Sequence, residues 1–227
     1  MILPSGTANI DPAIAKLETV AELLKHLGDI PAERVRWNPR PGTATEQDVI
    51  DAEGALRKRL CELVDGTLVE KAMGCYEARL GSVLSYFLES YLEKHDLGIC
   101  FGSDAMLRIL PQQVRMPDIS FVSWSQLPNR ELPAEPIATL TPELAVEVLS
   151  ISNTRREMER KRSEYFQTGT RLVWEIDPRI QTARIYSNPD QFHEIDLDGS
   201  LDGGEVLPGF SLSLRQLFTR AGRQSGS

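Results

Sequence analysis

Two acidic residues stand inside runs of apolar residues, and they are the first sign of chemistry in the sequence. Asp118 follows Pro117 and precedes the run 119–122, and Glu147 lies within the otherwise apolar run 144–149. A carboxylate in such a strand is buried and needs a partner. Two carboxylates that converge from neighbouring strands would form an oxygen-ligand pair for Mg²⁺ or Mn²⁺. In the alternative interpretation, an arginine or backbone N–H groups satisfy each acid.

A second set of reactive side chains follows Glu147 in the chain. Lys161 and Tyr165 are four residues apart, and Glu157 precedes Lys161 by one helical turn, so the three share one face of a predicted helix. That face can reach the carboxylates only if the helix crosses back above Glu147. We then expect Lys161 to point between Asp118 and Glu147. The alternative is a solvated helix with an ordinary Glu–Lys pair.

The elements that must position these residues are those of an α/β domain. The pattern predicts strands over residues 61–64, 67–71, 99–101, 106–110, 114–122, 144–149, 173–176 and 182–186, and helices over 11–28, 45–60, 80–97 and 154–168. We therefore predict an α/β fold with a mixed sheet flanked by helices over residues 61–220. An N-terminal helical arm over 1–60 precedes it, and a disordered tail over 221–227 follows.

Composition restricts the function classes. The formal net charge of −8 over 227 residues argues against a protein that coats nucleic acid indiscriminately. Residues 154–172 differ, with six basic and three acidic side chains, so Arg155, Arg156 and Arg162 are candidate contacts to a DNA backbone. The three cysteines and three histidines form no metal-binding motif, so a bound metal would have oxygen ligands. No apolar run approaches the roughly 20 residues that span a bilayer, and no signal peptide is evident, so we expect a cytoplasmic protein with no membrane partner.

The order of these motifs resembles that of the PD-(D/E)XK nuclease superfamily. Pro117-Asp118 and Glu147-Val148-Leu149 match its signature, except that Leu149 stands where lysine is usual. Lys161, on the next helix, is the candidate for the displaced lysine. Within the superfamily the chain is similar to the bacterial putative restriction endonuclease family of the Uma-two type. The segments that carry this resemblance are 115–119, 146–150, Lys161 with Tyr165, and 173–178.

The resemblance implies a restriction-endonuclease-like fold and a hydrolase that cleaves phosphodiester bonds of DNA. Asp118 and Glu147 would hold Mg²⁺ or Mn²⁺, Lys161 would stabilise charge on the phosphate, and Tyr165 would support them. Glu77 stands where some members place a third acid, but a first-turn acid favoured by the helix dipole explains it equally well. The resemblance also implies a homodimer that cuts two strands.

Two other function classes compete with a nuclease. A binding or regulatory module that kept the nuclease fold and lost its chemistry is favoured by Leu149 and by the acidic net charge, and a metal-binding assay separates it from an enzyme. An acyl-transfer hydrolase is the second. The sequence has no Gly-x-Ser-x-Gly elbow and no histidine near a candidate nucleophile, which argues against that class.

Overall fold

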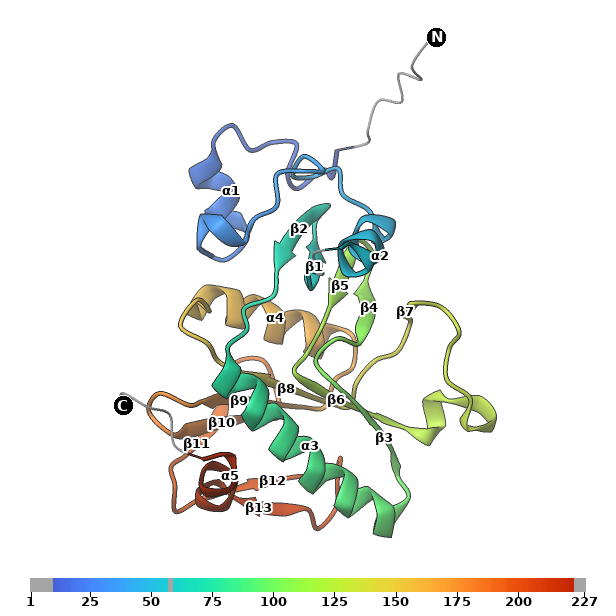
Figure 1. The fold of residues 1–227 in the computed structure, drawn as a ribbon, viewed down its shortest axis with the longest axis vertical. Helices are drawn as coiled ribbons and strands as arrows, with labels where there is room; N and C mark the ends of the chain where they lie inside the picture. Colours follow the sequence, from blue (N-terminus) through green and yellow to red (C-terminus); the bar gives the residue numbers. More distant parts are fainter. Residues whose placement is uncertain (1–9, 57–58, 223–227) are drawn as a thin grey trace.

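The computed structural model describes residues 10–56 and 59–222 and shows an α/β protein built around two mixed sheets (Figure 1). The helices are α1 Val20–His26, α2 Glu46–Gly54, α3 Cys75–His95, α4 Arg155–Gln167 and α5 Leu214–Ala221, with short 3₁₀ turns at Ala32–Arg34, Trp124–Gln126 and Pro128–Arg130. The strands are β1 Cys61–Val64, β2 Thr67–Glu70, β3 Gly98–Phe101, β4 Met106–Leu110, β5 Gln113–Arg115, β6 Ile119–Ser123, β7 Ile137–Ala138, β8 Leu144–Val148, β9 Leu172–Asp177, β10 Thr182–Tyr186, β11 Phe192–Ile195, β12 Ser200–Asp202 and β13 Ser211–Ser213. The predicted α/β fold class is confirmed, although the predicted strands belong to two main sheets instead of one.

The smaller of the two main sheets has the strand order β2-β1-β5-β4-β7. It begins with the hairpin of β1 and β2, which turns at Asp65 and Gly66 with φ angles of 46° and 66°. Positive φ at both central residues is the turn geometry that matches the twist of paired strands, and Asp-Gly favours it. In the hairpin, Glu62 pairs with Val69. Strand β1 also pairs with β5, so it lies between β2 and β5.

The larger sheet has the order β11-β10-β9-β8-β6-β3, and helices cover both of its faces. Strands β8 and β9 are parallel and are joined through α4, so Glu147 lies opposite Glu175. Because side chains alternate along a strand, Val146 and Val148 pack with α3 and α5, whereas Ala145 packs on the other face with Tyr165 of α4. Glu147 therefore faces α4.

The chain passes from one main sheet to the other at residues 116–118, within the predicted strand 114–122. Pro117 has no N–H group to continue a ladder, so β5 ends at Arg115 and β6 begins at Ile119. The Asp118 N–H already donates to the Val146 carbonyl, at 2.9 Å. Asp118 is therefore placed at the junction of the two sheets.

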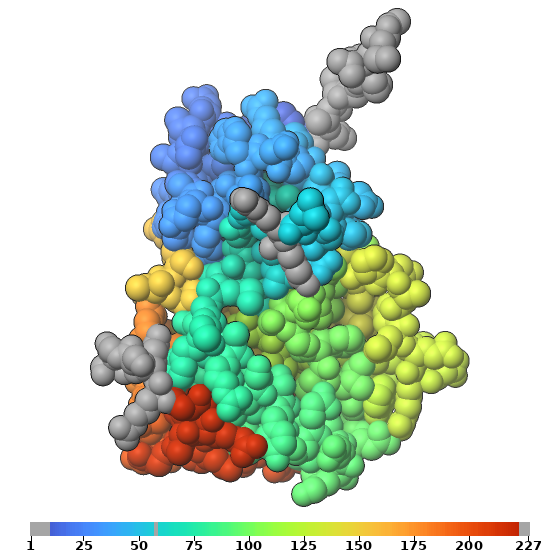
Figure 2. All heavy atoms as spheres, in the orientation of Figure 1, coloured from blue at the N-terminus to red at the C-terminus, as the bar shows by residue number. Residues whose placement is uncertain are grey.

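The N-terminal arm lies at one end of the molecule, beside the β1–β2 hairpin (Figures 1 and 2). The first predicted helix begins at Val20 instead of Asp11, because Thr19 and Glu22 form a reciprocal capping box, while residues 12–16 form turns. The arm's apolar side chains Ile14, Leu23, Leu27 and Ile30 pack on Val64 and Val69 of the hairpin.

The C-terminal part of the chain contains elements that the sequence patterns leave unassigned. Strands β11 to β13 and helix α5 follow β10, and α5 packs against α3 beside the larger sheet. Ala221, the first residue of the predicted disordered tail, ends α5 and is buried. Gly222 caps α5, and residues 223–227 of the predicted tail lie outside the described residues. Among the described helices, none has the length and apolarity to cross a membrane.

Candidate functional site

Asp118 lies at the junction of the sheets with both of its carboxylate oxygens in contact with donors. One oxygen, Oδ2, accepts a hydrogen bond from the Val148 N–H at 2.7 Å. The other, Oδ1, lies 2.9 Å from the ammonium of Lys71, and the Asp118 side chain is 16% exposed. Lys71 directly follows β2 and is not among the site residues predicted from the sequence. No local pattern signals this pairing, because the two residues meet only through the fold.

Glu147 is buried on the face of the larger sheet that α4 covers. The Tyr165 hydroxyl donates to its Oε1 at 2.6 Å, and the Lys161 ammonium lies 3.2 Å from each carboxylate oxygen. Burial raises the pKa of Glu147 to about 7, with the Asp118 charge adding to the rise and Lys161 opposing it. The structure thus brings Asp118 and Glu147, on neighbouring strands, close enough for their charges to interact.

Lys161 faces the site and not solvent, and its side chain is only 3% exposed. Its second carboxylate partner is Glu62 of β1, with Nζ to Oε1 at 2.9 Å, and not Asp118 as the sequence analysis expected. Burial by itself lowers the pKa of Lys161, but Glu147 and Glu62 outweigh burial and raise it. Lys161 therefore carries a positive charge between two carboxylates.

Glu62 is a member of the site that the sequence analysis missed. Its carboxylate accepts from the Met116 N–H at 3.1 Å and from Arg115 Nη1 at 2.9 Å, and it is almost completely buried. Burial alone would raise the pKa of Glu62, but Lys161 and Arg115 lower it to about 2. A signal was present, because Glu62 stands in an apolar strand run just as Asp118 and Glu147 do.

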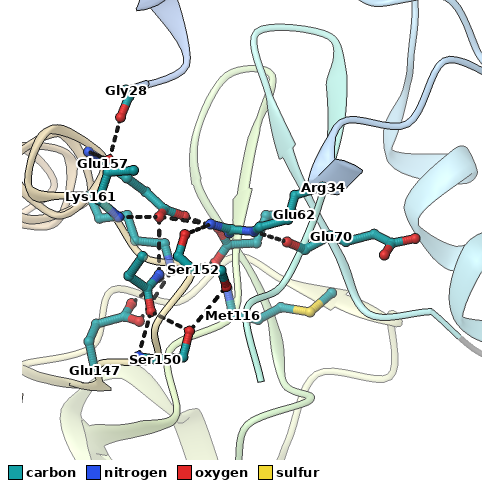
Figure 3. A network of polar contacts seen from close by, with 12 residues as sticks. Gly28, Arg34, Glu62, Glu70, Met116, Glu147, Ser150, Ser152, Glu157 and Lys161 are labelled. Carbon is teal, nitrogen blue, oxygen red and sulfur yellow. Dashed lines mark hydrogen bonds and ion pairs between the residues drawn. The ribbon is translucent and has the colours of Figure 1, made fainter. Parts of the chain in front are cut away.

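Glu157 does not reach Glu147 or Asp118 but binds the N-terminal arm (Figure 3). Arg34 donates from Nη1 and Nη2 to its two oxygens, at 2.9 and 2.6 Å, and both side chains are buried. Arg34 also donates to the carbonyls of Glu70 and Ser152. The arm, the hairpin and the loop before α4 thus meet at one guanidinium beside Lys161.

Glu77 lies in the first turn of α3 and lines a cavity of about 250 Å³ together with Asp118 and Asp104. Its carboxylate folds back over the helix N-terminus, where a Cβ added to Gly74 would lie 2.0 Å from Glu77 Oε2. This position suits the interaction of an acid with the helix dipole. The same position also leaves Glu77 on the wall of the cavity that Asp118 borders.

The three candidate DNA-contact arginines have different surroundings. Arg155 is 89% exposed and pairs with Glu159, and Arg156 is exposed and pairs with Asp29 of the arm. Arg162 is buried instead. Its guanidinium donates to Glu175 and to the Pro189 carbonyl and lies over the Tyr186 ring, so it neutralises a buried acid and is largely shielded from solvent.

The chemistry of the donor set suits a hard divalent cation. Within residues 10–56 and 59–222, no three or more His, Cys, Asp and Glu side chains form a metal-binding group. Mg²⁺ in proteins is usually bound by one or two carboxylates, with water and substrate phosphates completing its coordination. Asp118 and Glu147 supply such a pair of carboxylates, so the residues present fit Mg²⁺ or Mn²⁺.

The fold, with an acid at the start of one central strand and an acid within its neighbour, is that of the PD-(D/E)XK nucleases. The chain belongs to the Uma2 family, described as putative restriction endonuclease, whose model matches residues 53–215. A crystal structure of a putative nuclease belonging to DUF820, from Anabaena variabilis, is similar with a TM-score of 0.64 and 21% sequence identity, over 72% of this chain and 92% of that one. None of the curated proteins matches the chain.

Proposed function

We propose that this chain is a metal-dependent endonuclease that cleaves phosphodiester bonds of DNA. Its family and its fold support a nuclease-like function. The proposal adds DNA as the substrate, Mg²⁺ or Mn²⁺ as the cofactor, and Asp118 and Glu147 as its ligands, with Glu77 as a candidate third acid. The observation that carries it is the contact of Lys161 with both oxygens of Glu147, which supplies the lysine that Leu149 does not.

Each residue of the site has a separate role in phosphodiester hydrolysis. A bound divalent ion would polarise the phosphate and make its bound water more acidic. Lys161, kept charged by Glu147 and Glu62, stabilises the negative charge that develops on the phosphate. Tyr165 orients the Glu147 carboxylate through its hydroxyl. The exposed Arg155 and Arg156 contact the DNA backbone, which gives affinity without sequence preference.

The proposal extends to assembly and location. A homodimer places one site on each DNA strand, and size-exclusion chromatography with light scattering measures that state. We also propose that the protein acts in the cytoplasm.

The test is the cleavage of supercoiled plasmid and of short duplex DNA with Mg²⁺ or Mn²⁺. Lys161→Met should slow cleavage by about 10²- to 10³-fold, the range for loss of one electrostatic donor, while metal affinity changes far less. Lys94→Met, which removes an exposed charge from α3, is the matched control and should cleave like wild type.

Folding must be separated from chemistry, because Lys161→Met leaves two carboxylates buried beside an uncharged side chain. The variant Lys161→Met with Glu62→Gln removes one of these negative charges and should regain thermal stability without regaining cleavage. Equal rates for wild type and a folded Lys161→Met would contradict the role of Lys161. A wild-type protein that binds DNA but cleaves no tested substrate would favour a binding module that lost its chemistry.

A further inference from the structure

Lys71 is a buried cation that the proposed mechanism does not use. It directly follows β2, and its N–H donates to the Leu60 carbonyl at 2.8 Å, which fixes the backbone at this point. Its ammonium lies 2.9 Å from Asp118 Oδ1 and donates to the Ser103 carbonyl at 2.9 Å. The side chain is 3% exposed, so the ammonium is held inside the site and not at its rim.

The contacts of Asp118 leave no oxygen without a partner. The Val148 N–H holds Oδ2, and the Lys71 ammonium holds Oδ1. A backbone N–H is fixed by the strand, whereas an ammonium on a four-carbon stem can move. The oxygen that Lys71 contacts is therefore the one from which a donor can be displaced.

The acids of the site already have cationic partners without a divalent ion. The pairs are Asp118 with Lys71, Glu147 with Lys161, Glu62 with Arg115 and Lys161, and Glu157 with Arg34, and Arg115 also pairs with Glu164. A divalent cation placed on Asp118 would add two positive charges within a few ångströms of the Lys71 ammonium. In a buried environment such repulsion is several times stronger than in water.

A cavity lies beside Asp118 into which the Lys71 ammonium can move. The cavity of about 250 Å³ beside Asp118 is also lined by Ala72 and Ser103, the neighbour and the hydrogen-bond partner of Lys71, and by Glu77. A displaced ammonium can thus enter a space that has a carboxylate on its wall. Displacement would exchange one acidic partner for another and would not leave a charge buried alone.

We propose that Lys71 is an internal counter-ion that occupies the cation position at Asp118, so that a divalent metal binds only by displacing its ammonium. This inference rests on the proposed function, because it takes Asp118 as a metal ligand. It makes Lys71 a residue that sets metal affinity, and it predicts that the wild-type chain binds metal more weakly than its carboxylates alone would allow.

The experiment measures metal binding directly and needs no substrate. Mn²⁺ is titrated into wild type, Lys71→Met and Lys71→Arg, and free Mn²⁺ is followed by electron paramagnetic resonance, with circular dichroism to verify folding. Lys71→Met keeps most of the stem and removes the charge, so it should bind Mn²⁺ at least about tenfold more tightly than wild type. Lys71→Arg keeps the charge and should bind no more tightly than wild type. Lys94→Met controls for the loss of one positive charge from the chain.

A second variant locates the gain in affinity. Asp118→Asn introduced into Lys71→Met should abolish the tighter binding, because the carboxylate that Lys71 releases is then absent. Equal affinities of wild type and Lys71→Met, or weaker binding by Lys71→Met, would overturn the inference and leave the metal site itself standing. Absence of Mn²⁺ binding in all folded variants would contradict the metal-dependent function and, with it, the role given to Lys71.

Discussion

Glu62 shows how the stability of the site depends on a single buried charge. Its pKa in the folded protein is about 2, below the value of about 4.3 for an unperturbed glutamate. A lowered folded-state pKa contributes stability that is present above the unfolded value and is lost as the pH falls through the folded value. We therefore expect the free energy of unfolding to fall between about pH 4.5 and pH 2, by an amount on the order of 3 kcal/mol from this residue.

Urea denaturation over this pH range measures the effect. Glu62→Gln should be less stable than wild type at pH 7, because Arg115 and Lys161 lose a negative partner, and its stability should depend less on pH between 4.5 and 2. Glu93→Gln, at an exposed position of α3, is the matched control for the change in net charge. Parallel curves for wild type and Glu62→Gln would show that Glu62 is not the group that titrates.

The residues of the candidate site differ in how far the sequence predicts them. Asp118 and Glu147 are recognisable because a single acid in an apolar strand is a local signal, and Lys161 is recognisable because helical spacing sets its direction. The pairing of Lys71 with Asp118 joins residues 47 positions apart in the chain, and no periodicity encodes it. The partner of a buried charge is a property of the fold, which explains why Lys161 meets Glu62 where the sequence suggested Asp118.

The position of helix α4 decides whether Lys161 reaches Glu147. The sequence predicts a helix over 154–168 with Lys161 and Tyr165 on one face, and in the structure Thr154 and Glu157 form the capping box that begins it. What the sequence does not indicate is that the arm holds the start of the helix. Thr154 Oγ1 also bonds to the Gly28 carbonyl, and Gly28 packs directly on the Glu157 backbone.

Gly28 is therefore a sensitive position for α4. Its φ of +99° disfavours any side chain, and a Cβ there would lie 2.7 Å from Glu157 Cα. Gly28→Ala should lower the free energy of unfolding by about 1 to 3 kcal/mol, since both backbone strain and the clash oppose the native contact. Gly54→Ala, at the end of α2 where an added Cβ meets nothing within 4 Å, should not be destabilised. Chemical denaturation measures the free energy of unfolding of both variants. Equal values for the two would show that the arm moves freely relative to α4.

The part of the chain that matches the Uma2 family begins at residue 53, but the contacts that hold α4 begin in the arm. The arm supplies Arg34 to Glu157, Asp29 to Arg156, and the His26 carbonyl to Arg160. The arm and the family domain therefore share a buried ion pair, an exposed ion pair and apolar contacts. This arrangement makes the arm part of the structure that positions Lys161.

The Arg34–Glu157 pair is the most buried of these connections. Arg34→Met would leave Glu157 buried without its cation, which should cost about 3 to 5 kcal/mol of stability, the range for breaking a buried pair. Arg36→Met is the matched control, because Arg36 follows in the same segment but pairs with Glu70 near the surface, where such a pair contributes about 1 kcal/mol or less. Thermal and urea unfolding measure both effects.

The double variant Arg34→Met with Glu157→Gln tells apart the loss of a charge pair and the loss of packing. Because it removes the stranded carboxylate, it should recover much of the stability that Arg34→Met loses. If Arg34→Met costs no more than Arg36→Met, the apolar side chains of the arm alone hold it in place. A large loss that Glu157→Gln relieves would instead show that one buried ion pair joins the arm to the helix that carries Lys161.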